Sequence, residues 1–79
     1  HIVHLNIYPN PTVNKVFRIS ETGIKQLVLS DLQGRRLATL SPDASDELTF
    51  TVPAFIANGY YLLNGVLNGK TYTGKVMVR

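Results

Sequence analysis

The chain has 79 residues, enough for one domain but not for two, and its formal net charge is +3 at pH 7. It contains no cysteine, so a disulfide framework and a thiolate metal site are both excluded. No apolar run reaches the roughly 18 to 20 residues of a membrane helix, and no signal peptide opens the chain, so we expect no membrane insertion.

The first and last parts of the chain differ in charge. Up to Glu47, five basic residues balance five acidic ones, whereas residues 48–79 hold Lys70, Lys75 and Arg79 and no acidic residue. A nucleic-acid-binding surface needs a denser row of basic residues with interleaved aromatics, so we do not expect nucleic acid as a partner. The pattern fits solubility and protection of a strand edge, because lysine there discourages edge-to-edge pairing.

The chain starts at His1 without methionine, which indicates a single domain of residues 1–79 taken from a longer protein. Short β-rich segments recur every 8 to 12 residues or so, between clusters of Gly, Pro, Asn and Asp, and helical periodicity is missing. We expect seven strands, at residues 3–8, 15–20, 25–30, 35–40, 47–52, 60–67 and 71–78. This pattern predicts an all-β, antiparallel sandwich.

Tyr8, Pro9, Asn10 and Pro11, here called the proline segment, follow the first expected strand. The residue before a proline is restricted to extended conformations, and proline has no N–H to donate to a ladder. We therefore predict that the first strand stops at Pro9 and that the proline segment forms a rigid corner.

Turn chemistry separates the later strands. Asp31 follows an apolar strand and precedes Gly34, so its carboxylate can accept backbone N–H bonds across the turn and pair with one of the two arginines that follow. We call residues 31–35 the aspartate turn and expect it to be structural. Asn68 and Gly69 form a type I′ hairpin signal, which predicts that the last two strands pair antiparallel.

Alternation of apolar and polar residues along the strands predicts the core. The inward-facing candidates are Phe17, Ile19, Leu27, Leu29, Leu48, Phe50, Val52, Val76 and Val78. Gly65 interrupts a strand whose two faces are both rather apolar, which indicates a bulge or a close backbone approach. Phe55 or Ile56 is expected to plug one end of the sandwich.

No acid, base and nucleophile converge in the sequence, so we predict no catalytic residue, no cofactor site and no metal site. His1 and His4 lie near the start of the chain, where a solvated strand histidine is the simpler interpretation. Asp43, Asp46 and Glu47 offer oxygen ligands that suit calcium, but their spacing lacks the order of a known calcium loop. An acidic turn is the favoured interpretation.

The tyrosines support an alternative function. Tyr8, Tyr60, Tyr61 and Tyr72 can be combined into a platform on which sugars stack, although tyrosines without tryptophan more often pack strands. The alternative is therefore an immunoglobulin-like adhesion or carbohydrate-binding accessory module.

Four motifs in a fixed order resemble one family. They are the proline segment, the aspartate turn with Asp31, Gly34 and Arg35, a Gly-x-Tyr strand start at Gly59 and Tyr61, and a basic end. The sequence is similar, over nearly its whole length, to the type A C-terminal sorting domains of the type IX (Por) secretion system. It departs from the family pattern at Ser30, where an aromatic residue is common, and at Tyr60, which doubles the usual tyrosine.

The resemblance implies a seven-stranded immunoglobulin-like sandwich that is not an enzyme. It implies a signal that directs an N-terminally attached cargo, after export to the periplasm, through the outer-membrane translocon of a Gram-negative bacterium. A sortase-like surface peptidase often removes such a domain, and the cargo is then released or attached to the cell surface.

The family's last residues matter most to sorting, and they correspond here to the basic segment: Lys75, Val76, Met77, Val78 and Arg79. Recognition of the basic segment can combine the edge of the last strand with steering by its positive charges. The proline segment is expected to mark only the boundary between the cargo linker and the sorting domain.

Overall fold

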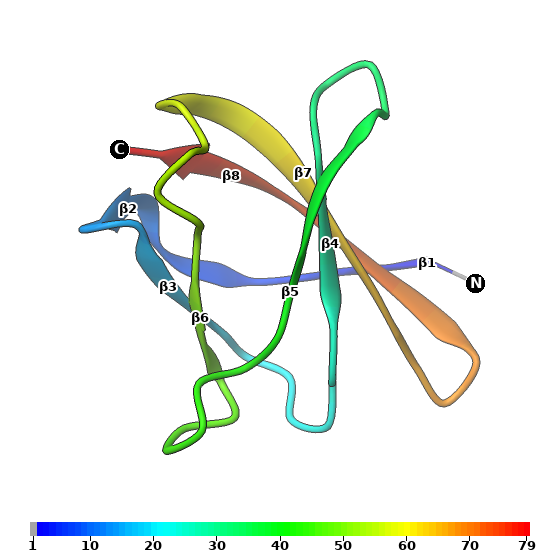
Figure 1. The fold of residues 1–79 in the computed structure, drawn as a ribbon. Helices are drawn as coiled ribbons and strands as arrows, with labels where there is room; N and C mark the ends of the chain where they lie inside the picture. Colours follow the sequence, from blue (N-terminus) through cyan, green and yellow to red (C-terminus); the bar gives the residue numbers. More distant parts are fainter. Residues whose placement is uncertain (1) are drawn as a thin grey trace.

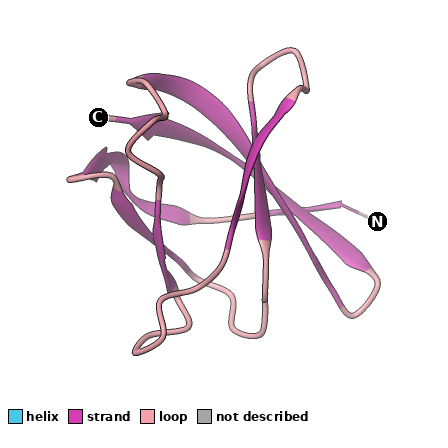
Figure 2. Ribbon diagram, in the orientation of Figure 1, coloured by secondary structure: helices cyan, strands magenta, loops and turns pink. Residues whose placement is uncertain are grey.

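A computed structural model describes residues 2–79, so that His1 lies outside the described residues. Within this range the chain forms eight strands in two sheets and no helix, and thus none that crosses a membrane (Figures 1 and 2). The strands are β1 (Ile2–His4), β2 (Ile7–Val13), β3 (Val16–Ile19), β4 (Leu27–Ser30), β5 (Arg36–Leu40), β6 (Thr49–Thr51), β7 (Gly59–Leu67) and β8 (Lys70–Val78). The all-β prediction is confirmed.

The larger sheet has five strands in the order β1-β8-β7-β4-β5, and the smaller has three in the order β2-β3-β6. β1 pairs with β8 in parallel, whereas the other pairs of described strands are antiparallel. The prediction of seven antiparallel strands is therefore wrong in number and in one orientation. The finer description as immunoglobulin-like stays a prediction.

The expected first strand is in fact two strands that belong to different sheets. β1 ends at His4, and β2 begins at Ile7 and runs through both prolines, so the prediction that the strand stops at Pro9 is wrong. β2 is an edge strand, and its register with β3 shifts between Tyr8 and Val13. Because the prolines lie inside this shifted stretch, the ladder requires no N–H from them.

β7 and β8 form a long hairpin that curves across the molecule from the orange turn to the C-terminal end (Figure 1). Their register is continuous from Gly59 opposite Val78 to Leu67 opposite Lys70, so the bulge considered at Gly65 is absent. The close approach is present instead, because a Cβ at Gly65 would lie 2.9 Å from Leu27 Cδ2. The hairpin turn has the positive φ angles that type I′ needs, 53° at Asn68 and 77° at Gly69.

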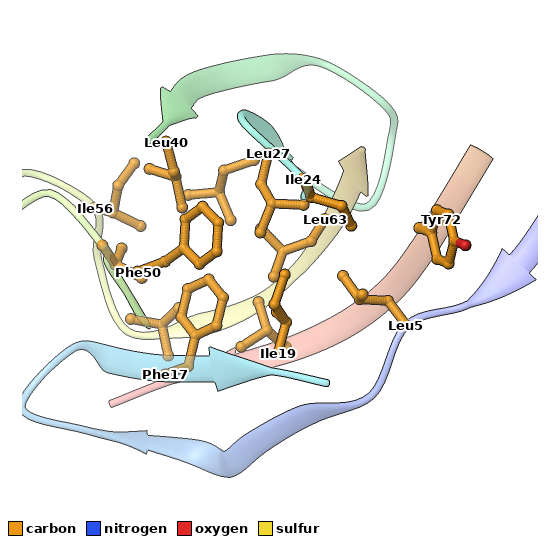
Figure 3. Packing of buried hydrophobic residues seen from close by; sticks show 14 residues of the cluster. Leu5, Phe17, Ile19, Ile24, Leu27, Leu40, Phe50, Ile56, Leu63 and Tyr72 are labelled. Carbon is orange, nitrogen blue, oxygen red and sulfur yellow. The ribbon is translucent and has the colours of Figure 1, made fainter. Parts of the chain in front are cut away.

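The core lies between the two sheets (Figure 3). All predicted core residues are buried except Leu48, which is half-buried. Phe17 and Phe50 face each other across β3 and β6 with ring centroids 5.7 Å apart and an interplanar angle of 11°. Ile56 closes the end of the core, whereas Phe55 is 75% exposed.

Candidate functional site

The basic segment forms the second half of β8 and alternates between the core and the solvent. Val76 and Val78 are fully buried, Lys75 and Arg79 are exposed, and Met77 is half-buried on the outward face. The outward side chains are therefore available to a partner while the valines anchor the strand.

An exposed tyrosine extends this outward surface. Tyr60 lies opposite Met77 in the β7–β8 ladder, and Lys75 Nζ lies 5.1 Å from the centroid of the Tyr60 ring. A cation at this distance from a ring face is attracted by the ring quadrupole. Lys75, Met77 and Tyr60 thus form one outward cluster of a cation, a thioether and an aromatic ring.

The proline segment lies directly beside the basic segment. Asn10 Nδ2 donates to the Lys75 carbonyl at 2.9 Å, and the Met77 N–H donates to Asn10 Oδ1 at 2.8 Å. The Arg79 N–H donates to Thr12 Oγ1 at 3.1 Å, and Thr12 is buried. Sequence reasoning missed these contacts and treated the proline segment only as a boundary.

The aspartate turn has the contacts predicted from the sequence. Asp31 Oδ1 accepts the backbone N–H groups of Gln33 at 3.0 Å and Arg35 at 2.9 Å, and Oδ2 lies 2.7 Å from Arg35 Nε. The Arg35 backbone N–H, with its guanidinium, holds the pKa of Asp31 below its ordinary value. Gly34 has φ of 90°, a left-handed conformation that favours glycine.

The Gly-x-Tyr motif begins β7. Gly59 is its first residue and lies opposite Val78 in the ladder. The Tyr61 hydroxyl donates to the Ala57 carbonyl at 2.6 Å and so fastens the strand to the turn that precedes it. The start of β7 is therefore fixed next to the end of β8.

Three of the four motifs adjoin one another at one end of the larger sheet, and the aspartate turn leaves that sheet toward the same end. The aspartate turn follows the last residue of β4, β7 starts at Gly59, and β8 ends at Val78, all at the same end of the larger sheet (Figure 1). Asn10 adds the proline segment to this end through its bonds to β8. The proline segment, the Gly-x-Tyr motif and the basic segment, which are far apart in sequence, are therefore neighbours in space.

The four tyrosines do not form the platform considered from the sequence. Tyr72 is buried and lies opposite Gly65, whereas Tyr60 is exposed near the other end of the hairpin. Tyr61 lies next to Tyr60 in the strand and so points to the opposite face. Tyr8 is on β2, in the smaller sheet. The platform considered as an alternative is not assembled from these four rings, because strand register distributes them over different faces.

The acidic loop is organised by its own hydrogen bonds. Asp43 Oδ1 accepts the Ser45 N–H and hydroxyl, both at 2.9 Å, and these bonds lower the pKa of Asp43. The Leu48 N–H and the Thr49 hydroxyl likewise lower the pKa of Asp46, which also pairs with Arg18 at 3.3 Å. Residues 2–79 contain no cluster of three or more His, Cys, Asp or Glu side chains placed to hold a metal.

Two further features complete the surface. A groove of about 440 Å³ lies over β4 and β7, and among the described residues that line it only Lys25 has an ionisable side chain. A lone lysine offers no acid and base pair, so the groove does not indicate a catalytic centre. His4 is exposed on β1 opposite Thr73, in agreement with a solvated strand histidine.

A protein-family model described as the secretion system C-terminal sorting domain matches residues 6–79. The chain belongs to this family. The sorting domain thus carries a type IX secretion signal of Gram-negative bacteria, in a family that acts with the secretion machinery and an N-terminal cargo and is not an enzyme class. Searches of curated proteins and of solved structures found no match.

Proposed function

We propose that this sorting domain directs an attached N-terminal cargo through the outer-membrane type IX translocon, and that the translocon recognises the outward side chains of the basic segment. The family match over residues 6–79 carries the proposal. The charge distribution supports the location, because residues 48–79 hold three basic residues and no acidic one.

Side chains, rather than the strand edge, offer the translocon its contacts. The outer edge of β8 is occupied by Asn10 at Lys75 and Met77 and by Thr12 at Arg79. An outward row beside Tyr60 is formed instead by the side chains of Lys75, Met77 and Arg79. The lysine and the arginine in this row are positively charged and can donate hydrogen bonds. An acidic surface on the translocon would attract this row and fix its orientation.

Cargo handling follows the family pattern in our proposal. The precursor crosses the periplasm, the translocon exports it to the outer-membrane surface, and a sortase-like peptidase removes the sorting domain. The cargo is then released or attached to the surface. The domain supplies the address and takes no catalytic part, so its only essential partners are the cargo, the translocon and the peptidase.

A reporter protein fused to the N-terminus of residues 1–79 tests the proposal in a bacterium that has the type IX system. We expect the double variant Lys75→Ser/Arg79→Ser to lose most of its surface delivery. The matched control is Lys25→Ser/Lys70→Ser, which removes the same charge outside the basic segment. Circular dichroism of each purified domain verifies that it folds.

Two outcomes would contradict this proposal. Delivery of the Lys75→Ser/Arg79→Ser fusion at the wild-type level would exclude a role for these charges, and an equal loss in both double variants would show that only net charge matters. Deletion of residues 75–79 is a less selective test, because it also removes the buried Val76 and Val78 from the core.

A further inference from the structure

The outer edge of β8 is closed first by backbone and then by side chains. β1 pairs in parallel with β8 as far as His4 opposite Thr73, and the Leu5 N–H donates to the Thr73 carbonyl at 2.7 Å. The chain then leaves this sheet, since Ile7 pairs with Ile19 in the smaller one. Without another partner, the backbone of the basic segment would be an open strand edge.

The Asn10 carboxamide takes the place of the missing strand. In a parallel ladder, a residue donates its N–H to one carbonyl of the neighbouring strand and accepts the N–H found two residues further along. Asn10 does the same with its side chain, donating to the Lys75 carbonyl and accepting the Met77 N–H. Its amide group therefore makes the two hydrogen bonds that a strand residue opposite Val76 would make.

Thr12 continues the closure by one more step. Thr12 is 3% exposed, and its hydroxyl accepts the Arg79 N–H at 3.1 Å. The Thr73 and Lys75 carbonyls and the Met77 and Arg79 N–H groups, all on the outer edge of β8, thus have partners. The closure reaches from the end of β1 to the end of the basic segment.

The composition of the proline segment suits this role. Pro9 and Pro11 have no N–H that needs a ladder partner, and the shifted register between Tyr8 and Val13 frees the intervening residues from β3. Asn10 can therefore turn its amide to β8 without leaving a ladder bond to β3 unmade. An asparagine between two prolines supplies a side-chain donor and acceptor at a place where the flanking residues have no backbone N–H to donate.

We propose that Asn10 is a positioning residue of the sorting signal. Its amide holds residues 75–79 in strand conformation, so that Lys75, Met77 and Arg79 meet the translocon at the fixed spacing of a strand face. This inference rests on the proposed function. It assigns the proline segment a direct part in the signal, beyond marking the start of the domain.

Amide hydrogen exchange of the full chain, followed by NMR, tests the closure. In Asn10→Ala we expect protection of the Met77 N–H to fall about tenfold, the effect of one lost hydrogen bond, and protection of the Arg79 N–H to fall with it. The amide of Leu63, in the middle of the larger sheet, reports on global unfolding and is expected to stay unchanged. The matched control is Asn6→Ala, which removes an exposed amide from the link between β1 and β2.

The same variants in the reporter fusion test the role in sorting. We expect reduced surface delivery for Asn10→Ala and wild-type delivery for Asn6→Ala. Unchanged protection at Met77 and Arg79 in Asn10→Ala would overturn the closure. If Asn10→Ala does not fold, amide exchange in the wild-type chain tests the closure instead. Met77 and Arg79 amides that exchange as fast as exposed turn amides would overturn it.

The outcomes separate this inference from the proposed function. If protection falls in Asn10→Ala but delivery is normal, while Lys75→Ser/Arg79→Ser still blocks delivery, the positioning role is wrong and the proposed function stands. If Lys75→Ser/Arg79→Ser is delivered normally, the proposed recognition of the basic side chains is wrong and the positioning role falls with it, whereas the assignment as a sorting domain is unaffected.

Discussion

The aspartate turn and the proline segment use the same device over very different distances. In both, a polar side chain bonds to backbone groups that lack strand partners. Asp31 reaches residues two and four positions away, whereas Asn10 reaches residues 65 and 67 positions away. The aspartate turn can therefore form from its own five residues, but the proline segment works only once the whole domain has folded. In the proposed sorting role, presentation of the basic segment thus depends on completed folding.

The largest expected loss of stability is at Gly74, where β8 passes close to the residues that follow β1. A Cβ at Gly74 would lie 2.7 Å from Ile7 Cδ1 and 2.9 Å from the Leu5 carbonyl oxygen, and the backbone oxygen cannot move cheaply. We expect Gly74→Ala to lower the free energy of unfolding by about 2 to 3 kcal/mol, measured by urea denaturation.

The control for Gly74→Ala is a glycine in the aspartate turn. Gly34 has open space around its Cβ position but a positive φ, so Gly34→Ala should cost only about 1 kcal/mol of backbone strain. Equal losses in the two variants would show that the long-range crossing is no more demanding than the local turn.

A smaller loss of stability is expected at Thr12, which bonds to the last residue of the basic segment. Thr12→Val keeps the buried shape but removes the acceptor of the Arg79 N–H. We expect a loss of about 1 kcal/mol in unfolding free energy and faster amide exchange at Arg79. Thr12→Ser keeps the hydroxyl and should preserve the slow exchange; faster exchange in Thr12→Ser as well would mean that packing, and not the hydrogen bond, protects Arg79.

The two regions should also respond differently to acid. The folded chain lowers the pKa values of Asp31, Asp43 and Asp46, chiefly through backbone N–H groups of Arg35, Ser45 and Leu48. Their stabilisation is therefore present above the ordinary carboxyl pKa of about 4 and is lost as the pH falls through the lower folded values. Thermal melts between pH 6 and pH 2 should show a falling Tm.

Asp31→Asn should reduce that pH dependence of the Tm, because it removes one of the three carboxyl groups whose pKa is lowered in the folded chain. The Asn10 amide does not titrate, so its own bonds to β8 supply no pH-dependent stability. A Tm that stays constant down to pH 2, or an Asp31→Asn variant with the full wild-type slope, would contradict the role given to the Asp31 carboxylate.

The smallest effect is expected on the outward cluster. The contact of Lys75 with the exposed Tyr60 ring should contribute about 0.5 kcal/mol. A double-mutant cycle with Tyr60→Leu and Lys75→Met measures it. A coupling energy of zero would mean that Lys75 is oriented by β8 alone, without help from β7.

Local chemistry was predictable from the sequence. The hairpin at Asn68 and Gly69, the carboxylate bonds of Asp31 and the alternating core of β3, β4 and β6 all depend on residues close together in the chain. Such features follow from backbone preferences and from a side-chain period of two.

The division of the first strand was not predictable in this way. Val3, Leu5 and Ile7 alternate as they would in one continuous strand, yet Val3 is in β1 and Ile7 is in β2 of the other sheet. Leu5 is buried between them in the core, so the apolar pattern is the same for one strand or for two. Only the pairing of β1 with β8, which is far along the chain, decides between one strand and two.

The role of Asn10 was missed for a related reason. Its partners are backbone groups of Lys75 and Met77, which leave no mark on the sequence. The only sequence feature that could have indicated this role is an asparagine flanked by two prolines, since the side-chain amide of Asn10 has no evident partner in the strand to which it belongs. The same limit applies to the tyrosines, whose faces depend on the register of β7 with β8.

The most direct test of the account is to detect the hydrogen bond of Asn10 itself. Through-bond NMR couplings across hydrogen bonds can join the Met77 amide nitrogen to the Asn10 Cγ, and the Asn10 Nδ2 to the Lys75 carbonyl carbon. We predict both couplings in the isotope-labelled wild-type chain, together with those of the β7–β8 ladder. Ladder couplings without any coupling to Asn10 would contradict the claim that the proline segment holds the basic segment in place.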